Sequence, residues 1–127
     1  MTHNKLEKPP LVLIAEDDDS AYLLISTLLK KALLRSIRAS NGAEAVELVR
    51  KNHEIQLVLM DMRMPEMDGL EATRLIKFHW SDLSVIALTA YEYDEKKQAI
   101  MEAGCDDFIS KPICRNDLKN RLQKYGL

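Results

Sequence analysis

Short apolar runs alternate with segments of helical periodicity along the chain, and this alternation limits the fold more than any other feature. The runs are Leu11–Ala15, Leu57–Met60, Leu83–Leu88 and Phe108–Ile109, and Ser36–Ala39 is expected to be a second, short strand after the first of them. A short continuous apolar run suits a strand that is buried on both faces. Between the runs, apolar residues recur at helical spacing, as Leu24 and Leu28 do. The pattern predicts five strand–helix units and a parallel sheet with helices on both faces.

The helices that follow these strands have recognisable boundaries. They are expected over Ser20–Leu34, from Asn41 through Val49, from Asp68-Gly69 towards Trp80, over Asp94–Ala103, and around Leu118, Leu122 and Tyr125. Asn41 with Glu44 resembles a capping box at the start of the second helix. Asp19 or Ser20 is expected to cap the first helix, and Asp68 the third.

Length and composition describe an ordinary soluble domain. The 127 residues suit one domain, and 46% hydrophobic with 30% charged residues is a globular mixture. A net charge of −2 gives no reason to expect nucleic-acid binding by this chain alone. No apolar run approaches the ~20 residues that span a bilayer. We expect a flexible lead-in over residues 1–9, one domain over residues 10–127 and a cytoplasmic location, where Cys105 and Cys114, which lack metal or redox spacing, stay reduced.

Polar residues follow four of the five predicted strands, at the point where each strand ends. Glu16 and Asp17 follow the first strand, Asp61 the third and Thr89 the fourth, and Lys111 comes shortly after the fifth. Carboxyl ends of parallel strands meet at one edge of the sheet, where such folds place their sites. Singly, each residue is typical of a turn or a helix cap. It is their joint order that predicts a site.

Acids, a hydroxyl and an ammonium at one edge favour phosphoryl chemistry. Clustered carboxylates repel each other, and a divalent cation removes that cost. Ligands that are all oxygen favour Mg²⁺ over zinc. A carboxylate is a nucleophile towards phosphoryl groups, and phosphoryl transfer needs mainly positioning and charge neutralisation.

At this point the chain clearly resembles the response-regulator receiver family. The resemblance covers about residues 10–125 and is carried by LVLIAEDD at 11–18, LVLMDMRMPEMDG at 57–69, VIALTA at 85–90 and AGCDDFISKP at 103–112. It implies a flavodoxin-like (βα)5 fold with strand order 2-1-3-4-5. It also implies a signalling module that is not an enzyme, although it assists its own phosphorylation and dephosphorylation.

The resemblance also implies a role for each site residue. Asp61 corresponds to the phosphoryl acceptor, and Glu16 and Asp17 to the acidic pair that holds Mg²⁺, Asp17 directly and Glu16 through water. The backbone carbonyl of Arg63 would add a ligand, and Mn²⁺ can take the place of Mg²⁺. Lys111 would pair with the phosphoryl group.

A second set of residues is implied to switch or tune the domain. Thr89 corresponds to the switch hydroxyl and Phe108 to the switch aromatic, which is Tyr in many members. The Lys111–Pro112 peptide would be cis. Arg63 and Tyr91 occupy positions that tune the lifetime of the acyl phosphate, and their size favours slow loss.

Partners and context follow from the same resemblance. A histidine kinase or histidine phosphotransfer domain would donate the phosphoryl group, and a downstream target protein would read the result. No membrane partner is expected. The sequence leaves open whether the domain forms a homodimer. The chain ends about where a receiver ends, which fits a free-standing regulator, a receiver of a hybrid kinase or a phosphate shuttle.

Two other classes of protein share part of this pattern, a phosphatase and a binding module. A haloacid-dehalogenase-type phosphatase also uses an aspartate nucleophile, but it needs a second Asp where this chain has Arg63. A receiver-like binding module without phosphorylation usually lacks one of the key residues, all of which are present here. No GxxxxGK[ST] motif occurs, which excludes a P-loop nucleotide binder.

Overall fold

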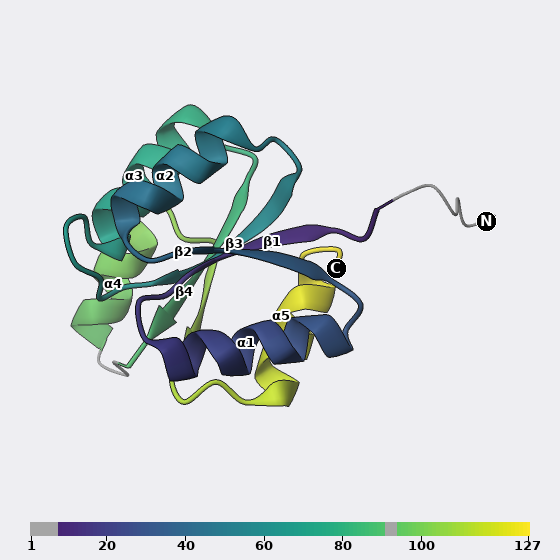
Figure 1. The fold of residues 1–127 in the computed structure, drawn as a ribbon. Helices are drawn as coiled ribbons and strands as arrows, with labels where there is room; N and C mark the ends of the chain where they lie inside the picture. The colour runs from purple at the N-terminus through teal and green to yellow at the C-terminus, as the bar shows by residue number, and fades with distance from the viewer. Residues whose placement is uncertain (1–7, 91–93) are drawn as a thin grey trace.

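The computed structural model describes residues 8–90 and 94–127, and in these it contains one five-stranded parallel sheet with the order β2-β1-β3-β4-β5 (Figure 1). The strands are β1 (Leu11–Ala15), β2 (Arg35–Ala39), β3 (Ile55–Asp61), β4 (Ser84–Thr89) and β5 (Asp107–Ser110). The helices are α1 (Asp19–Lys31), α2 (Gly42–Lys51), α3 (Gly69–His79), α4 (Asp94–Glu102) and α5 (Arg115–Lys124). The predicted flavodoxin-like fold and strand order are confirmed.

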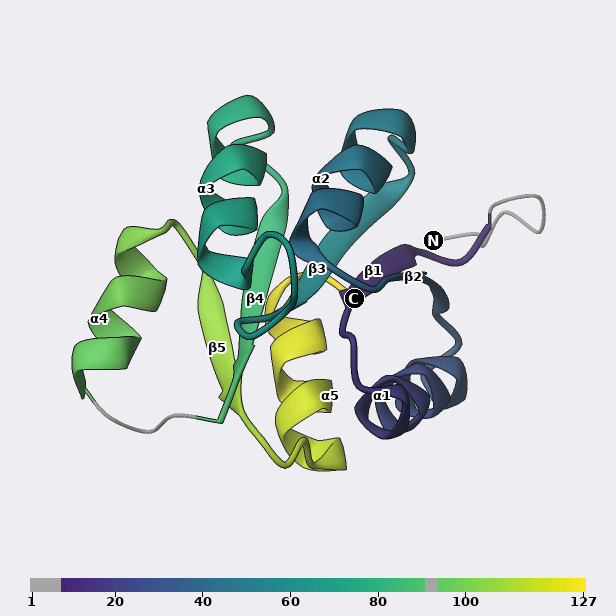
Figure 2. The ribbon, with the colours of Figure 1, turned by 60° about the vertical axis from the view of Figure 1, so that its left-hand side comes forward.

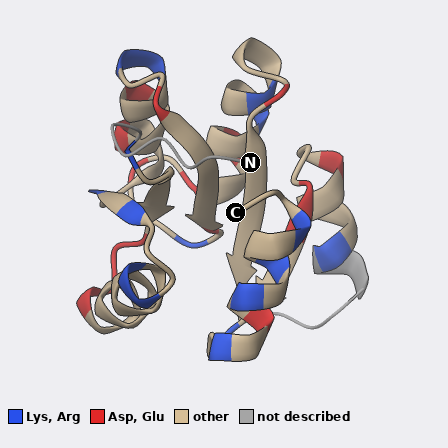
Figure 3. Ribbon diagram, turned by 90° about the vertical axis from the view of Figure 1, so that its right-hand side faces the viewer, with Lys and Arg blue, Asp and Glu red and all other residues tan. Residues whose placement is uncertain are grey.

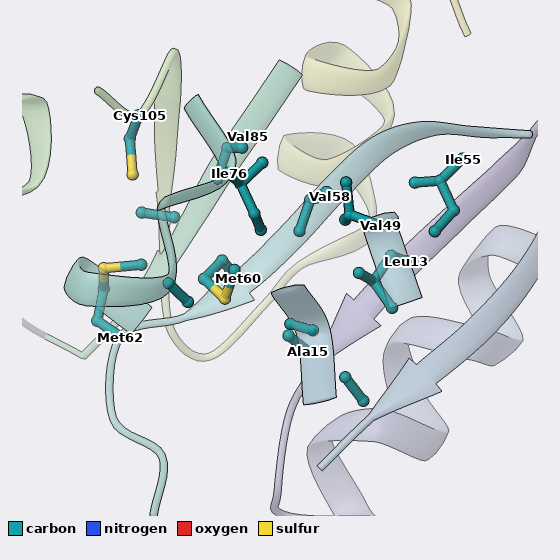
Figure 4. Packing of buried hydrophobic residues seen from close by; sticks show 14 of the residues in the cluster. Leu13, Ala15, Val49, Ile55, Val58, Met60, Met62, Ile76, Val85 and Cys105 are labelled. Carbon is teal, nitrogen blue, oxygen red and sulfur yellow. The ribbon is translucent and has the colours of Figure 1, made fainter. Parts of the chain in front are cut away.

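Helices cover the sheet on both faces, and each face has its own apolar core. In Figures 1 and 2, α1 and α5 lie on one side of the sheet and α2, α3 and α4 on the other. Successive side chains of β1 point to opposite faces of the sheet. Leu13 packs in the core beneath α2, α3 and α4, and Ile14 packs in the core beneath α1 and α5; these are called the α2–α4 core and the α1–α5 core. Figure 4 shows the first core, where Met60 of β3 lies near Ile76 of α3. The predicted burial on both faces is confirmed for β1, β3 and β4, whereas the edge strand β2 is only half-buried over most of its length.

Two helix starts are capped as the sequence predicts. The side chain of Asn41 accepts a hydrogen bond from the Glu44 amide at 2.7 Å, and the Glu44 carboxylate accepts one from the Ser40 amide at 3.1 Å. Asp68 accepts a hydrogen bond from the Glu71 amide at 2.9 Å at the start of α3. These contacts satisfy amides that have no partner within the helix.

The first helix differs from the prediction at both ends. Its cap is Asp18, not Asp19 or Ser20, because Asp18 is extended and its carboxylate accepts a hydrogen bond from the Ala21 amide at 2.7 Å. The helix ends at Lys31, short of Leu34. Leu34 lies beyond the helix end and packs in the α1–α5 core. Because it is a buried apolar residue close behind the helix, the apolar pattern extends the predicted helix to include it.

Charged residues are concentrated outside the centre of the sheet. Figure 3 shows the inner strands largely tan, with blue and red on the helices, the loops and one edge strand. That edge strand is β2, which carries Arg35 and Arg38. Of the helices in the described part of the chain, none is long and apolar enough to cross a membrane. Residues 1–7 of the predicted lead-in lie outside the described residues, so the boundary at residue 9 stays a prediction.

Candidate functional site

A small cleft opens at the carboxyl edge of the sheet, between β1, β3, β4 and β5. It has a volume of about 150 Å³. Its lining combines acidic, basic, hydroxyl and apolar side chains: Glu16, Asp17, Asp18, Asp61, Met62, Arg63, Leu88, Thr89, Ala90 and Lys111. The topology thus brings together the five polar residues that the sequence singled out at the ends of four strands: Glu16, Asp17, Asp61, Thr89 and Lys111.

Asp61 ends β3 and lies at the floor of this cleft with only 5% of its surface exposed. Its Oδ1 atom is 3.4 Å from the Lys111 ammonium and accepts a hydrogen bond from the Arg63 amide at 3.1 Å. Gly69 packs against the backbone of Asp61, where an added Cβ would come within 2.2 Å of the Asp61 carbonyl oxygen. Only glycine permits this close approach, which holds the loop before α3 against the end of β3.

Glu16 is fully buried directly after β1, which is unusual for a carboxylate. Lys111 donates a hydrogen bond to its Oε1 atom at 2.6 Å, and the Asp18 amide lies 3.3 Å from Oε2. The ion pair with Lys111 compensates for the loss of hydration. Lys111 therefore joins Glu16 and Asp61 across the cleft.

The electrostatic state of these groups follows from burial and mutual contact. Burial and the neighbouring Glu16 carboxylate raise the pKa of Asp61 to about 7. Burial also opposes ionisation of Glu16, but its hydrogen bonds with Asp61 and Lys111 outweigh it and lower the pKa of Glu16. Burial alone would lower the pKa of Lys111, and the two carboxylates raise it instead. Without a cation, the cleft therefore holds a carboxylate pair for which full ionisation is costly.

The donor set fits a hard divalent cation. Glu16, Asp17 and Asp61 each offer one carboxylate oxygen, and these oxygens lie within 4.8 Å of one another. All are oxygen ligands, as Mg²⁺ prefers. Asp17 is exposed at the rim, whereas the other two are buried, so a bound ion would keep contact with water on one side.

Thr89 and Lys111 are fixed to each other by the backbone. Thr89 ends β4 and is 2% exposed, and its carbonyl oxygen accepts a hydrogen bond from the Lys111 amide at 2.7 Å. The peptide bond between Lys111 and Pro112 is cis. The last residue of β4 and the residue that follows β5 thereby place a hydroxyl and an ammonium on the same wall of the cleft.

The residues expected to switch or tune the domain lie at different distances from the cleft. Phe108 of β5 is half-buried and does not line the cleft; the Lys97 ammonium lies 5.0 Å from the centre of its ring. Arg63 lines the cleft with an exposed side chain. Tyr91 lies outside the described residues.

Two further residues lie beside the site. Asp18, expected from the sequence to shape the loop outside the metal site, lines the cleft as well as capping α1. Sequence reasoning missed the other residue. Arg38 of β2 contacts the loop that carries Glu16 and Asp17. A basic residue near the end of a predicted strand, next to Ala39, was the available signal, but an edge strand carries charges for many reasons.

A doubly wound parallel sheet with an acidic cleft, a threonine and a lysine at its carboxyl edge defines the class of receiver domains. The chain matches the response regulator receiver domain family over residues 12–123, and it belongs to that family. Receiver domains are generally signalling modules without an enzymatic activity of their own. The match decides against the phosphatase alternative.

Two relatives place the chain among different kinds of receiver. The polar-differentiation response regulator DivK of Brucella anthropi is 37% identical over 83% of this chain and 86% of its own length. The sensor histidine kinase GacS of Pseudomonas protegens is 32% identical over 93% of this chain, but the chain spans only 13% of that kinase. Receivers of this type thus occur nearly alone and as parts of hybrid sensor kinases.

Two solved structures share the fold. The receiver domain of the sensor histidine kinase PA1611 from Pseudomonas aeruginosa, which has a magnesium ion coordinated in its active-site cleft, is 28% identical, with a TM-score of 0.85 over 92% of this chain and 97% of that one. The co-crystal structure of the Saccharomyces cerevisiae phosphotransfer protein Ypd1 and the Ssk1 receiver domain provides a match with 25% identity and a TM-score of 0.87, over 96% of this chain and 92% of that one.

Proposed function

We propose that Asp61 accepts a phosphoryl group from a phosphohistidine and that the acyl phosphate switches a partner-binding face of this domain. The observation that carries the proposal is the position of the Asp61 carboxylate, 3.4 Å from the Lys111 ammonium and within 4.8 Å of two further acidic side chains. This arrangement offers a nucleophile, a cation site and a fixed positive charge around one point.

The reaction needs only one bond to form and one to break. A carboxylate oxygen of Asp61 attacks phosphorus, the O–P bond forms, and the P–N bond to the donor histidine breaks. The imidazole leaves with the electron pair and takes up a proton. Lys111 and the hydroxyl of Thr89 stabilise the phosphoryl oxygens from the wall of the cleft.

A bound divalent cation supplies the remaining charge neutralisation during this transfer and during later hydrolysis by water. Asp17 and Asp61 would hold Mg²⁺ directly, Glu16 through water, and the backbone carbonyl of Arg63 would add a ligand. The magnesium ion in the PA1611 receiver supports this assignment. Mn²⁺ is proposed as a substitute, because it shares the preference for carboxylate and water ligands.

The signal is proposed to pass from Thr89 to Phe108. An added phosphoryl group attracts the Thr89 hydroxyl, and the ring of the half-buried Phe108 then fills the vacated space. This movement takes the ring away from Lys97, which now lies over it at 5.0 Å. Arg63 and Tyr91 are proposed to slow loss of the phosphoryl group. The result is a shift between two states that a downstream protein reads.

The phosphohistidine is proposed to come from a histidine kinase or phosphotransfer domain that docks beside the cleft. A hollow of about 230 Å³ lies there, lined by Ser20, Ala21, Leu24, Lys111, Pro112 and Ile113. It shares Lys111 with the cleft, so a helix seated on it can present its histidine to Asp61. Leu24 is 43% exposed and offers the apolar contact. The Ypd1–Ssk1 co-crystal supports a partner of this class.

The cellular context is proposed on the same grounds. Residues 10–127 form the receiver, in the cytoplasm, as a free-standing regulator like DivK or within a hybrid kinase like GacS. Self-association is a further proposal, and the oligomeric state in solution before and after phosphorylation tests it.

The test is the intact mass after incubation with acetyl phosphate and Mg²⁺. Wild type and the control Asp82→Asn, which changes an exposed aspartate in the turn before β4, should each gain one phosphoryl group, about 80 Da. Asp61→Asn should gain none, and EDTA should prevent the gain in wild type and in Asp82→Asn. No adduct on wild type, with acetyl phosphate or with a phosphohistidine protein as donor, would favour a receiver that serves only as a binding module.

A further inference from the structure

The side chain of Arg38 extends from β2 and hydrogen-bonds to the backbone of the loop that carries Glu16 and Asp17, two of the acidic residues of the cleft. Its Nε atom donates a hydrogen bond to the carbonyl oxygen of Glu16 at 3.1 Å, and its Nη2 atom donates one to the carbonyl oxygen of Asp17 at 3.2 Å. The same Nη2 atom lies 2.9 Å from the carboxylate of Asp19. One guanidinium therefore ties together the backbone of consecutive residues between β1 and α1.

This pair of hydrogen bonds requires the planar guanidinium of arginine. Nε and one terminal nitrogen lie along the same edge of the planar guanidinium, so they can reach two successive carbonyl groups at once. A lysine ammonium is a single point and cannot reproduce that fork. The guanidinium also stacks on the Tyr22 ring of α1, 4.4 Å from its centre, and the side chain is only 25% exposed. Packing thus holds the fork in place and limits competition from water.

The loop needs such support because its backbone hydrogen bonding to the neighbouring strand β2 ends at its first residue, Glu16. The amide of Glu16 still donates to the Ala39 carbonyl of β2 at 3.0 Å. Asp18 is already occupied in capping α1. Between these points the Glu16 and Asp17 carbonyl groups are fixed by Arg38, and the direction of each carbonyl sets the direction of the side chains beside it.

We propose that Arg38 is a positioning residue for the cation site: it holds the backbone of Glu16 and Asp17 so that their carboxylates converge with Asp61. The inference rests on the proposed function, since it assigns a role towards the divalent cation of that site. Partners that orient metal ligands without touching the metal contribute about 10–100-fold to metal affinity. Arg38 acts through the backbone, which leaves the carboxylates themselves free for the ion.

A positioning role and a simple charge effect have opposite signs. A guanidinium near the cleft repels a cation, so removal of its charge alone would tighten Mg²⁺ binding. Loss of positioning would weaken binding instead. Arg38→Lys keeps the charge and loses the fork, which separates the two effects within one pair of variants.

The experiment measures the dissociation constant for Mg²⁺ by calorimetry on metal-stripped protein. Arg38→Ala should bind Mg²⁺ about tenfold more weakly than wild type. Arg38→Lys should show most of that loss of affinity, because it lacks the two-point contact. Arg35→Ala is the matched control, because Arg35 lies on the same strand but contacts Pro9 and Glu54, away from the cleft; its affinity should stay within about twofold of wild type. Hydrogen exchange without metal should be faster at the amides of residues 17 and 18 in Arg38→Ala, and unchanged in Arg35→Ala.

Equal or tighter Mg²⁺ binding by Arg38→Ala, with wild type still phosphorylated on Asp61, would overturn the role of Arg38 and leave the proposed function intact. Absence of both Mg²⁺ binding and phosphorylation in wild type would overturn both. Circular dichroism shows whether each variant is folded at the temperature of the titration. If Arg38→Ala does not fold, Arg38→Lys carries the comparison, and wild-type affinity in that variant would overturn the proposal.

Discussion

Asp61 and Asp107 are both buried carboxylates beside lysines, yet their surroundings act on them in opposite directions. Burial and the adjacent Glu16 raise the pKa of Asp61 to about 7. Burial also opposes ionisation of Asp107, but the Phe108 amide, Lys124 and Arg121 outweigh it and lower the pKa. The difference is the second carboxylate, which is costly unless a cation joins it. The same residue type therefore has a raised pKa in the candidate site at one end of the sheet and a lowered pKa in an ion-pair cluster at the other.

The Asp107 cluster should stabilise the fold in a manner that depends on pH. A carboxylate whose pKa is lowered in the folded state stabilises that state above the unfolded pKa of about 4, and this contribution is lost as the pH falls below it. Asp107→Asn should reduce the free energy of unfolding by about 1–3 kcal/mol near neutral pH. Urea unfolding should show the gap between variant and wild type narrowing in acid. A gap that stays constant or widens in acid contradicts the assignment, and the exposed Asp82→Asn serves as control.

The two cysteines should react very differently with alkylating agents. Cys105 is buried beside Thr73, and burial raises the pKa of its thiol to about 11. Cys114 is exposed at the start of α5. Because the thiolate is the reactive form, iodoacetamide should modify one thiol in native protein and two in urea, as read by intact mass. Cys114→Ser should take up none while folded; rapid native labelling of that variant would show that Cys105 is accessible.

At the scale of elements, a strained residue follows the end of α1. Leu33 has a φ of 62°, in the left-handed region, and its amide donates to the Lys30 carbonyl as the helix closes. The side chain is 79% exposed, so it contributes little packing. Left-handed backbone costs a non-glycine residue about 1–2 kcal/mol, and Gly104, with a φ of 102°, follows α4 without that cost.

Leu33→Gly should therefore stabilise the domain. Glycine gives back part of the gain through its larger entropy in the unfolded chain, which leaves about 0.5–1 kcal/mol. The midpoint of chemical denaturation should rise in Leu33→Gly and stay unchanged in Leu33→Ala, which keeps the strain. A rise in both variants would assign the effect to removal of an exposed leucine instead.

The start of α1 should be needed for a protein donor but not for a small one. Leu24→Glu puts a charge into the apolar hollow beside Lys111 and should slow transfer from a phosphohistidine protein at least tenfold. Phosphorylation by acetyl phosphate should stay at the wild-type rate, because the cleft itself is unchanged. Phe78→Glu, at an 82% exposed position on α3, is the matched control. Equal loss with both donors would mean that the substitution damages the cleft rather than docking.

Helix and strand positions could be predicted closely from the sequence, whereas some boundaries could not. Apolar runs and the Asn41–Glu44 box are local signals that the fold preserves. The cap of α1 was misassigned because Asp18, Asp19 and Ser20 are all good capping residues, and only the backbone geometry selects Asp18. Leu34 was placed in the helix because a core residue beyond a helix end has the same hydrophobicity as one within it.

On the scale of the whole molecule, parallel topology makes the site predictable from order alone. The carboxyl ends of β1, β3, β4 and β5 lie at one edge, so Glu16, Asp61, Thr89 and Lys111, which end or directly follow these strands, meet there although they are distant in the sequence. The hydrogen bond from Lys111 to Glu16 and the grip of Arg38 on the acidic loop were not predictable. Both depend on side-chain directions across the sheet, which a one-dimensional pattern does not record.

The central claim is that Asp61 carries the phosphoryl group, and locating the acyl phosphate tests it most directly. Wild type is phosphorylated with Mg²⁺ present, reduced with borohydride, which converts an aspartyl phosphate to homoserine, and mapped by peptide mass spectrometry. The account predicts homoserine at position 61 alone, and none when Mg²⁺ is removed before the donor is added. Homoserine at position 17 or 18 with Asp61 unmodified, or a stable phosphate on a hydroxyl residue, would contradict the account.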